Sequence, residues 1–138
     1  MRLRPEAEFQ TSIPDEGIEE DGDFVEFPGR KVTEAISAML SGLGYEMSAP
    51  FHAEHAGWEL DARANGRRIW LRIASMDDTS YVLFTKDMTW QFWRRDPSFA
   101  DFLTGLNAAL QQDDRFDEIL WSRDWRDNTR SPDPVTKA

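Results

Sequence analysis

The chain's only two histidines lie in the segment His52-Ala53-Glu54-His55. On a helix, residues three apart share a face, so this pair with a nearby carboxylate could hold a metal ion or act as general bases. The stretch between Pro50 and Gly57 is too short for a firm helix, and the spacing H-E-x-x-H of zinc proteases is absent. The sequence therefore predicts a polar loop, with no metal, no cofactor and no enzyme activity. The alternative is a small enzyme or metal-binding protein that uses His52 and His55 with nearby carboxylates.

A second candidate site is the stretch Thr89-Trp90-Gln91-Phe92-Trp93-Arg94-Arg95, which combines large aromatic side chains with arginines. Trp and Arg are enriched in binding hot spots, because they bury a large area and keep a polar group. Two interpretations stay open: core packing, or an exposed recognition patch for a protein. Stacking on single-stranded bases is a third, and the chain's net charge of −10 disfavours it. The candidate binding residues here are Trp90, Trp93, Arg94 and Arg95.

The strongest local signal is a β-hairpin over residues 57–74. Asn65-Gly66 is a favoured pair for a two-residue type I′ turn, and centring the turn there sorts apolar residues onto one face. That apolar face holds the pairs Trp58–Ile73, Leu60–Leu71 and Ala62–Ile69. The polar face holds the pairs Glu59–Arg72, Asp61–Trp70 and Arg63–Arg68. Directly opposed arginines are unfavourable, so Arg63, Arg68, Trp70 and Arg72 are candidate binding residues. The alternative is local neutralisation by the two acidic residues of the same face.

The remaining elements must support this hairpin. Apolar spacing predicts a helix over 32–43 and a second helix that begins near Asp96-Pro97 and ends near 110. Strands are expected at 81–86 and 119–121. This order predicts an α+β fold: an antiparallel meander sheet of four to five strands with two amphipathic helices packed on one face. The folded domain is expected at residues 28–126.

Charge is unevenly distributed along the chain. Net charge is −10 over residues 1–62, +4 over 63–95 and −4 over 96–138. The stretch 15–23 holds six acidic side chains and one isolated aliphatic, too few apolar groups to offset the entropy of ordering. We therefore expect a largely flexible acidic tail at 1–27 and a flexible tail at 127–138. The acidic tail is expected to lie transiently over the Trp70/Arg72 face or the Trp93/Arg94 patch and to shield it until a partner competes.

Composition excludes several classes of protein. The chain has no cysteine, which excludes a disulfide scaffold and a thiolate metal site and is typical of a reducing compartment. No apolar run reaches the ~20 residues of a membrane span, and no signal peptide is expected. These features predict a cytoplasmic protein. Nucleic-acid and membrane partners are not expected, since an acidic protein repels both nucleic acid and anionic lipid.

The element order resembles that of type III secretion chaperones. The residues that carry this resemblance are Leu40-Ser41-Gly42-Leu43-Gly44-Tyr45 at the end of the first helix, the hairpin of 57–74 and the strand of 81–86, within roughly residues 31–110. In small size and acidic charge the chain is also similar to immunity proteins of bacterial toxin systems. The resemblances imply a non-enzymatic, chaperone-like or immunity-like bacterial module. It would bind a protein partner through aromatic and arginine anchors and an acidic surface, and a homodimer is compatible with it.

Overall fold

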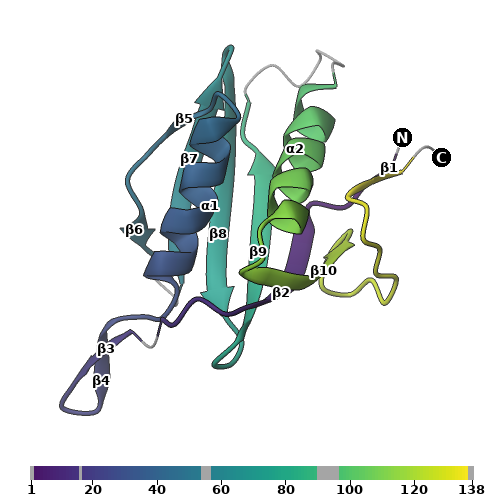
Figure 1. Cartoon of the computed structure of the whole chain (residues 1–138). Helices are drawn as coiled ribbons and strands as arrows, with labels where there is room; N and C mark the ends of the chain where they lie inside the picture. Colours follow the sequence, from purple (N-terminus) through teal and green to yellow (C-terminus); the bar gives the residue numbers. More distant parts are fainter. Residues whose placement is uncertain (1, 16, 54–56, 90–96, 137–138) are drawn as a thin grey trace.

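The computed structural model describes residues 2–15, 17–53, 57–89 and 97–136. In this part of the chain, two helices lie against a mostly antiparallel sheet (Figure 1). The helices are α1 (Arg30–Gly42) and α2 (Ser98–Gln112). The strands are β1 (Arg2–Leu3), β2 (Glu6–Thr11), β3 (Ile18–Glu20), β4 (Asp23–Glu26), β5 (Glu46–Met47), β6 (Phe51–His52), β7 (Trp58–Ala64), β8 (Arg67–Ser75), β9 (Ser80–Asp87), β10 (Phe116–Ser122) and β11 (Val135–Thr136). The α+β class is confirmed.

Strands β7 and β8 form the predicted hairpin in the predicted register. Leu60 lies opposite Leu71, and Arg63 lies opposite Arg68. Asn65 and Gly66 have φ angles of 52° and 77°, so both turn residues are in the left-handed region that a type I′ turn requires. Strand β9 pairs with β8 and completes three strands of a meander.

The sheet is larger than the four to five strands expected. The order is β10-β2-β9-β8-β7-β5, with β6 also paired to β7, which makes seven strands. The sheet is also not a simple meander, because β2 from the N-terminal region lies between β9 and β10. The connection from β9 to β10 therefore crosses over one strand, and α2 lies within that connection.

The expectation of a flexible tail at 1–27 is wrong for β2. Ala7 and Phe9 are buried, and Phe9 stacks on Tyr81 with ring centroids 5.9 Å apart. Two buried apolar residues are enough to hold this short strand in the sheet, because pairing with β9 and β10 satisfies the hydrogen-bonding groups of its backbone. The acidic stretch also has structure, since β3 and β4 pair into a separate two-stranded sheet that projects from the body (Figure 1).

The C-terminal segment also differs from the expected tail at 127–138. Strand β11 pairs with β1, and the backbones of Trp121 and Ser131 exchange two hydrogen bonds of 2.7 and 2.9 Å. Arg4 is buried and donates to the carbonyl of Asp133. The first and last described strands therefore pack together, and the ordered unit extends beyond the predicted boundaries of 28 and 126.

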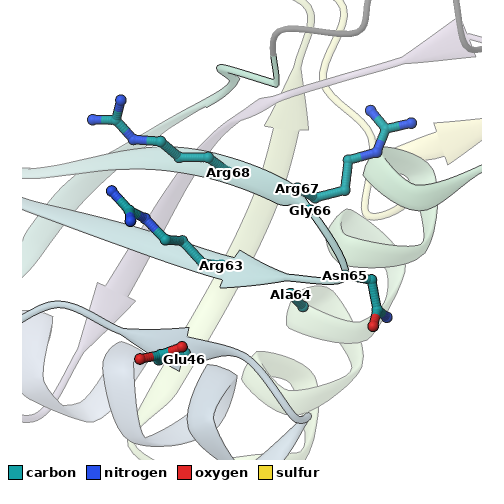
Figure 2. A pocket seen from close by; sticks show the side chains of 7 residues that line it. All are labelled: Glu46, Arg63, Ala64, Asn65, Gly66, Arg67 and Arg68. Carbon is teal, nitrogen blue, oxygen red and sulfur yellow. The ribbon is translucent and has the colours of Figure 1, made fainter.

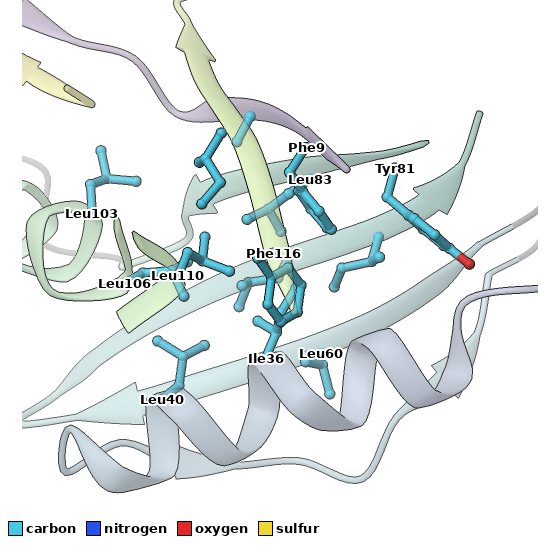
Figure 3. Close-up of a cluster of buried hydrophobic side chains, with 14 of the residues drawn as sticks. Phe9, Ile36, Leu40, Leu60, Tyr81, Leu83, Leu103, Leu106, Leu110 and Phe116 are labelled. Carbon is cyan, nitrogen blue, oxygen red and sulfur yellow. The ribbon is translucent and has the colours of Figure 1, made fainter. Parts of the chain in front are cut away.

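Helices α1 and α2 lie next to each other in front of the sheet (Figure 1). Their buried residues join alternate residues of β2, β7, β8 and β9 in one core, of which Figure 3 shows a part. The N-terminus of α1 is capped from a distance, because the carboxylate of Asp15 accepts the backbone N–H of Lys31 at 2.7 Å. Helix α2 has Pro97 at its N-cap position, and Asp96, near which the helix was expected to begin, lies outside the described residues. Neither helix has the length and apolar character that crossing a membrane requires.

Candidate functional site

The side of the sheet that faces away from the core carries the residues that the sequence singled out. Side chains alternate between the two faces of a strand, so the buried residues of β7, β8 and β9 leave their polar neighbours on the other side. We call this side the open face. Among the described residues, neither helix lies on it (Figure 1). The open face holds Glu59, Asp61, Arg63, Arg68, Trp70, Arg72, Val82, Phe84 and Lys86.

Arg63 and Arg68 are the most prominent feature of this face. Figure 2 shows their side chains leaving adjacent strands in the same direction, whereas Arg67 points the other way. Arg68 binds Asp61 through two nitrogen–oxygen contacts of 3.3 Å. Arg68 thus has an ion-pair partner, whereas Arg63 lies opposite Glu46 on β5 without forming an ion pair in the described part of the chain.

An open pocket of about 510 Å³ lies beside this pair. Its lining comes from the end of the β7–β8 hairpin and from Glu46 on the neighbouring strand (Figure 2). Guanidinium groups present fixed, paired N–H donors that match the two oxygens of a carboxylate. This arrangement can therefore accept a carboxylate from outside the chain, with Asn65 and the turn backbone at its rim.

Trp70 extends the site along the open face. Its indole N–H donates to Glu59 at 2.9 Å, and the ring is half-buried opposite Asp61 and Lys86. Arg72 lies half-buried next in the same direction, opposite Glu59. The local neutralisation that the sequence left as an alternative is present for Arg68 and for the Trp70 N–H. We call Arg63, Arg68, Trp70 and Arg72 the Arg/Trp patch.

The other four predicted binding residues, Trp90, Trp93, Arg94 and Arg95, lie outside the described residues. The chain enters that stretch directly beside the Arg/Trp patch. The backbone N–H of Met88 donates to the carbonyl of Arg68 at 2.8 Å, and the Arg68 N–H donates to the Thr89 hydroxyl at 3.1 Å. The choice between core packing and recognition for this stretch stays a prediction.

His52 has a structural role in the described part of the chain. Its Nε2 accepts the backbone N–H of Phe27 at 2.9 Å, which leaves that nitrogen without a free lone pair. The imidazole also packs between the rings of Phe27 and Trp58, at centroid distances of 4.8 and 4.7 Å. His55 lies outside the described residues. Within them, no group of three His, Asp or Glu side chains is arranged to hold a metal ion.

The acidic stretch lies away from the Arg/Trp patch. Asp15 and Glu19 line a pocket of about 390 Å³ together with Ser75 and Asp77, at the C-terminal end of β8. The two patch arginines of the hairpin lie at the opposite end of these strands. The expected transient shielding of the Trp70/Arg72 face or the Trp93/Arg94 patch by residues 15–23 stays a prediction. Asp15 caps α1.

Sequence reasoning missed one strongly exposed aromatic residue. Trp125 is 76% exposed, in a loop that follows β10. Nothing in the local sequence distinguishes it from the buried Trp121 four residues earlier. The flanking arginines and aspartates of Arg123-Asp124-Trp125-Arg126-Asp127 are the one available signal, because a charged surround is typical of an exposed position.

Comparison of the chain with protein-family models, with characterised proteins and with solved structures gave no match, so a functional interpretation rests on the site itself.

Proposed function

We propose that the protein is a non-enzymatic binding module that takes a carboxylate-bearing segment of a protein partner on the Arg/Trp patch. The observation that carries this proposal is the opposed pair Arg63–Arg68, which has Asp61 as its one carboxylate partner among the described residues. Opposed like charges cost stability, and an incoming carboxylate between them would relieve that cost. Binding of a partner's carboxylate would therefore gain two attractive contacts and would also reduce the repulsion between Arg63 and Arg68.

Trp70 supplies the apolar part of the proposed contact. Its N–H is already bound to Glu59, so the exposed part of the ring is free to be covered by an apolar side chain without loss of a hydrogen bond. Arginine and tryptophan are both enriched among the residues that contribute most to binding at protein interfaces. The predicted contribution of Trp90, Trp93, Arg94 and Arg95 belongs to the same proposal, since that stretch begins beside Arg68.

The net charge of −10 sets the kind of partner. Long-range repulsion grows with the charge of the partner, so the proposed partner is a protein whose acidic groups are confined to a short segment rather than a nucleic acid, which is charged at every phosphate. At physiological salt, charges more than about 8 Å apart are largely screened, and the arginine pair then acts locally. A chaperone-like or immunity-like role in the cytoplasm fits such a module, and the lack of cysteine suits a reducing compartment.

The enzyme alternative has less support from the geometry. A general base or metal ligand needs an available ring nitrogen, and His52 uses Nε2 to hold Phe27. His52 and Trp58 both bind the backbone of Phe27, since the Trp58 indole N–H donates to the Phe27 carbonyl at 3.0 Å. These two hydrogen bonds hold the segment that leads into α1. These contacts support a structural role for His52 rather than a role in catalysis or metal binding.

Calorimetric titration with a synthetic peptide tests the proposal. The probe is a capped octapeptide of alternating Glu and Leu, and the control peptide has Gln in place of Glu. We expect the acidic peptide alone to bind at physiological salt, and Arg63→Ala to weaken it about fivefold, equivalent to roughly 1 kcal/mol for one exposed charge-assisted contact. Lys31→Ala, which removes an equal charge from exposed helix surface, is the matched control and should leave affinity unchanged. Equal binding of both peptides, or preference for a single-stranded oligonucleotide, would contradict the proposal.

A further inference from the structure

The loop that carries Trp125 is closed and internally ordered. Its base is the antiparallel bridge between Trp121 and Ser131. Inside the loop, the carboxylate of Asp124 accepts the backbone N–H of Arg126 at 2.8 Å. A compact loop with joined ends and its own internal contacts is a common form of binding element. Trp125 is thus held outward by ordered backbone, which lowers the entropy that binding would cost.

A groove of about 600 Å³ lies on the open face at the β2–β10 edge of the sheet. Two of the exposed large apolar residues of the described chain line it, Met76 at 57% and Leu120 at 38% exposure. Glu8 and Glu118 also line the groove. Glu8 is paired with Arg130 at 3.4 Å, whereas Glu118 forms no ion pair in the described part of the chain and carries the negative charge of the groove. The remaining lining residues are Phe9, Gln10, Ser80 and Tyr81.

A bulge in β10 creates this groove. The pairing of β10 with β2 shifts register between Asp117 and Leu120, and Glu118 has a φ angle of 50°. The extra residue lets Phe116 and Ile119 both face the core, and it turns Leu120 outward. Leu120 and Met76 thus place two exposed apolar side chains in one groove, where an apolar group of a partner can cover both.

We propose that two copies of the chain form a twofold dimer in which Trp125 of each copy enters the groove of the other. The loop and the groove both belong to the β10 edge, since Leu120 precedes Trp125 by five residues. A twofold axis beside this edge can therefore make the two insertions reciprocal, as an isologous interface requires. The most exposed charges agree: the side chains of Arg123 and Arg126 beside the indole are 69% and 72% exposed, whereas Asp124, with which both pair, is 28% exposed, and the groove carries acidic residues.

This dimer is independent of the Arg/Trp patch. The patch lies on β7 and β8, whereas the groove lies between β10 and the β8–β9 turn. The groove is lined by residues of β2, β10 and the start of β9 and by Met76, whereas Arg63 and Arg68 lie at the other end of β8, beside the β7–β8 turn. A dimer through the groove therefore leaves the patch accessible, and failure of one proposal does not decide the other.

Light scattering after size exclusion tests the dimer over concentrations from low micromolar to near millimolar. We expect the wild-type mass to rise toward twice the 16.0 kDa of the chain. Trp125→Ala should weaken dimerisation at least about tenfold, as expected for a central hot-spot residue. The matched control is Phe51→Ala, which removes another exposed aromatic ring, on β6, and should have no effect. A wild-type monomer at all concentrations, or unchanged dimerisation of Trp125→Ala, would overturn the proposal.

A charge exchange adds a test that misfolding cannot mimic. Glu118→Arg makes the groove basic, and Arg126→Glu makes the loop acidic. Each variant alone should dimerise at least severalfold more weakly, because like charges then meet at both reciprocal contacts. An equimolar mixture of the two variants should dimerise like the wild type, because each loop then meets a groove of opposite charge. Failure of the mixture to recover, with both variants folded by circular dichroism, would rule out reciprocal insertion.

Discussion

Replacing Phe9 tests whether the N-terminal segment belongs to the core. Its side chain is 2% exposed, and its ring centroid lies 5.9 Å from that of Tyr81 and 5.3 Å from that of Phe116. Truncation of such a residue to alanine removes its transfer free energy and leaves a cavity, at a cost of about 3–5 kcal/mol. A domain has a total stability of about 5–15 kcal/mol, so Phe9→Ala should remove a large part of it.

Urea unfolding followed by tryptophan fluorescence measures this loss. With a slope of about 2 kcal/mol per molar urea, the midpoint should fall by about 2 M. The matched control is Phe24→Ala, in the same N-terminal region but with a side chain 43% exposed on β4. Its cost should be about 1 kcal/mol or less. Equal midpoints for the two variants would refute the placement of β2 inside the sheet.

Three further predictions follow from single contacts. Asp15→Ala should destabilise the protein by about 1 kcal/mol through loss of the cap on α1, and an unchanged thermal midpoint would argue against this cap. Burial and the nearby charges of Asp15 and Asp78 raise the pKa of Tyr81 to about 12, from 10.0 in an unfolded chain. Since the folded pKa is the higher, the stability that Tyr81 contributes is complete below pH 10 and is lost as pH rises from 10 to 12. Unfolding at a series of pH values should show a shallower decline for Tyr81→Phe than for the wild type. Gly66→Val should cost about 1–2 kcal/mol, because Gly66 has a φ of 77° and valine resists that conformation; a wild-type melting temperature would contradict the turn type.

The sequence predicted those parts of the fold that are determined by residues close together in the chain. The Asn65-Gly66 turn and the alternation beside it fix the β7–β8 register, and the register alone sets Arg63 against Arg68. The arginine pair was therefore predictable residue by residue. The spacing of apolar residues likewise predicted both helices, with boundaries that differ by a few residues.

Non-local pairing explains the errors. Strand β2 has two apolar residues facing the core, and its partners lie some 70 and 110 residues further along the chain. A segment of this kind shows no amphipathic signal strong enough to separate it from an acidic tail. The cap of α1 by Asp15 and the exposure of Trp125 depend in the same way on contacts between distant segments.

Nuclear magnetic resonance of the labelled protein tests the central claim most directly. Titration with the acidic Glu-Leu octapeptide should shift the indole N–H of Trp70 and the guanidinium Nε–H signals of Arg63 and Arg68 most strongly. Backbone signals on the exposed surfaces of α1 and α2 should stay in place, and so should the indole N–H of Trp125. The largest shifts on the helices or at Trp125, with Trp70 unmoved, would contradict the assignment of partner binding to the Arg/Trp patch.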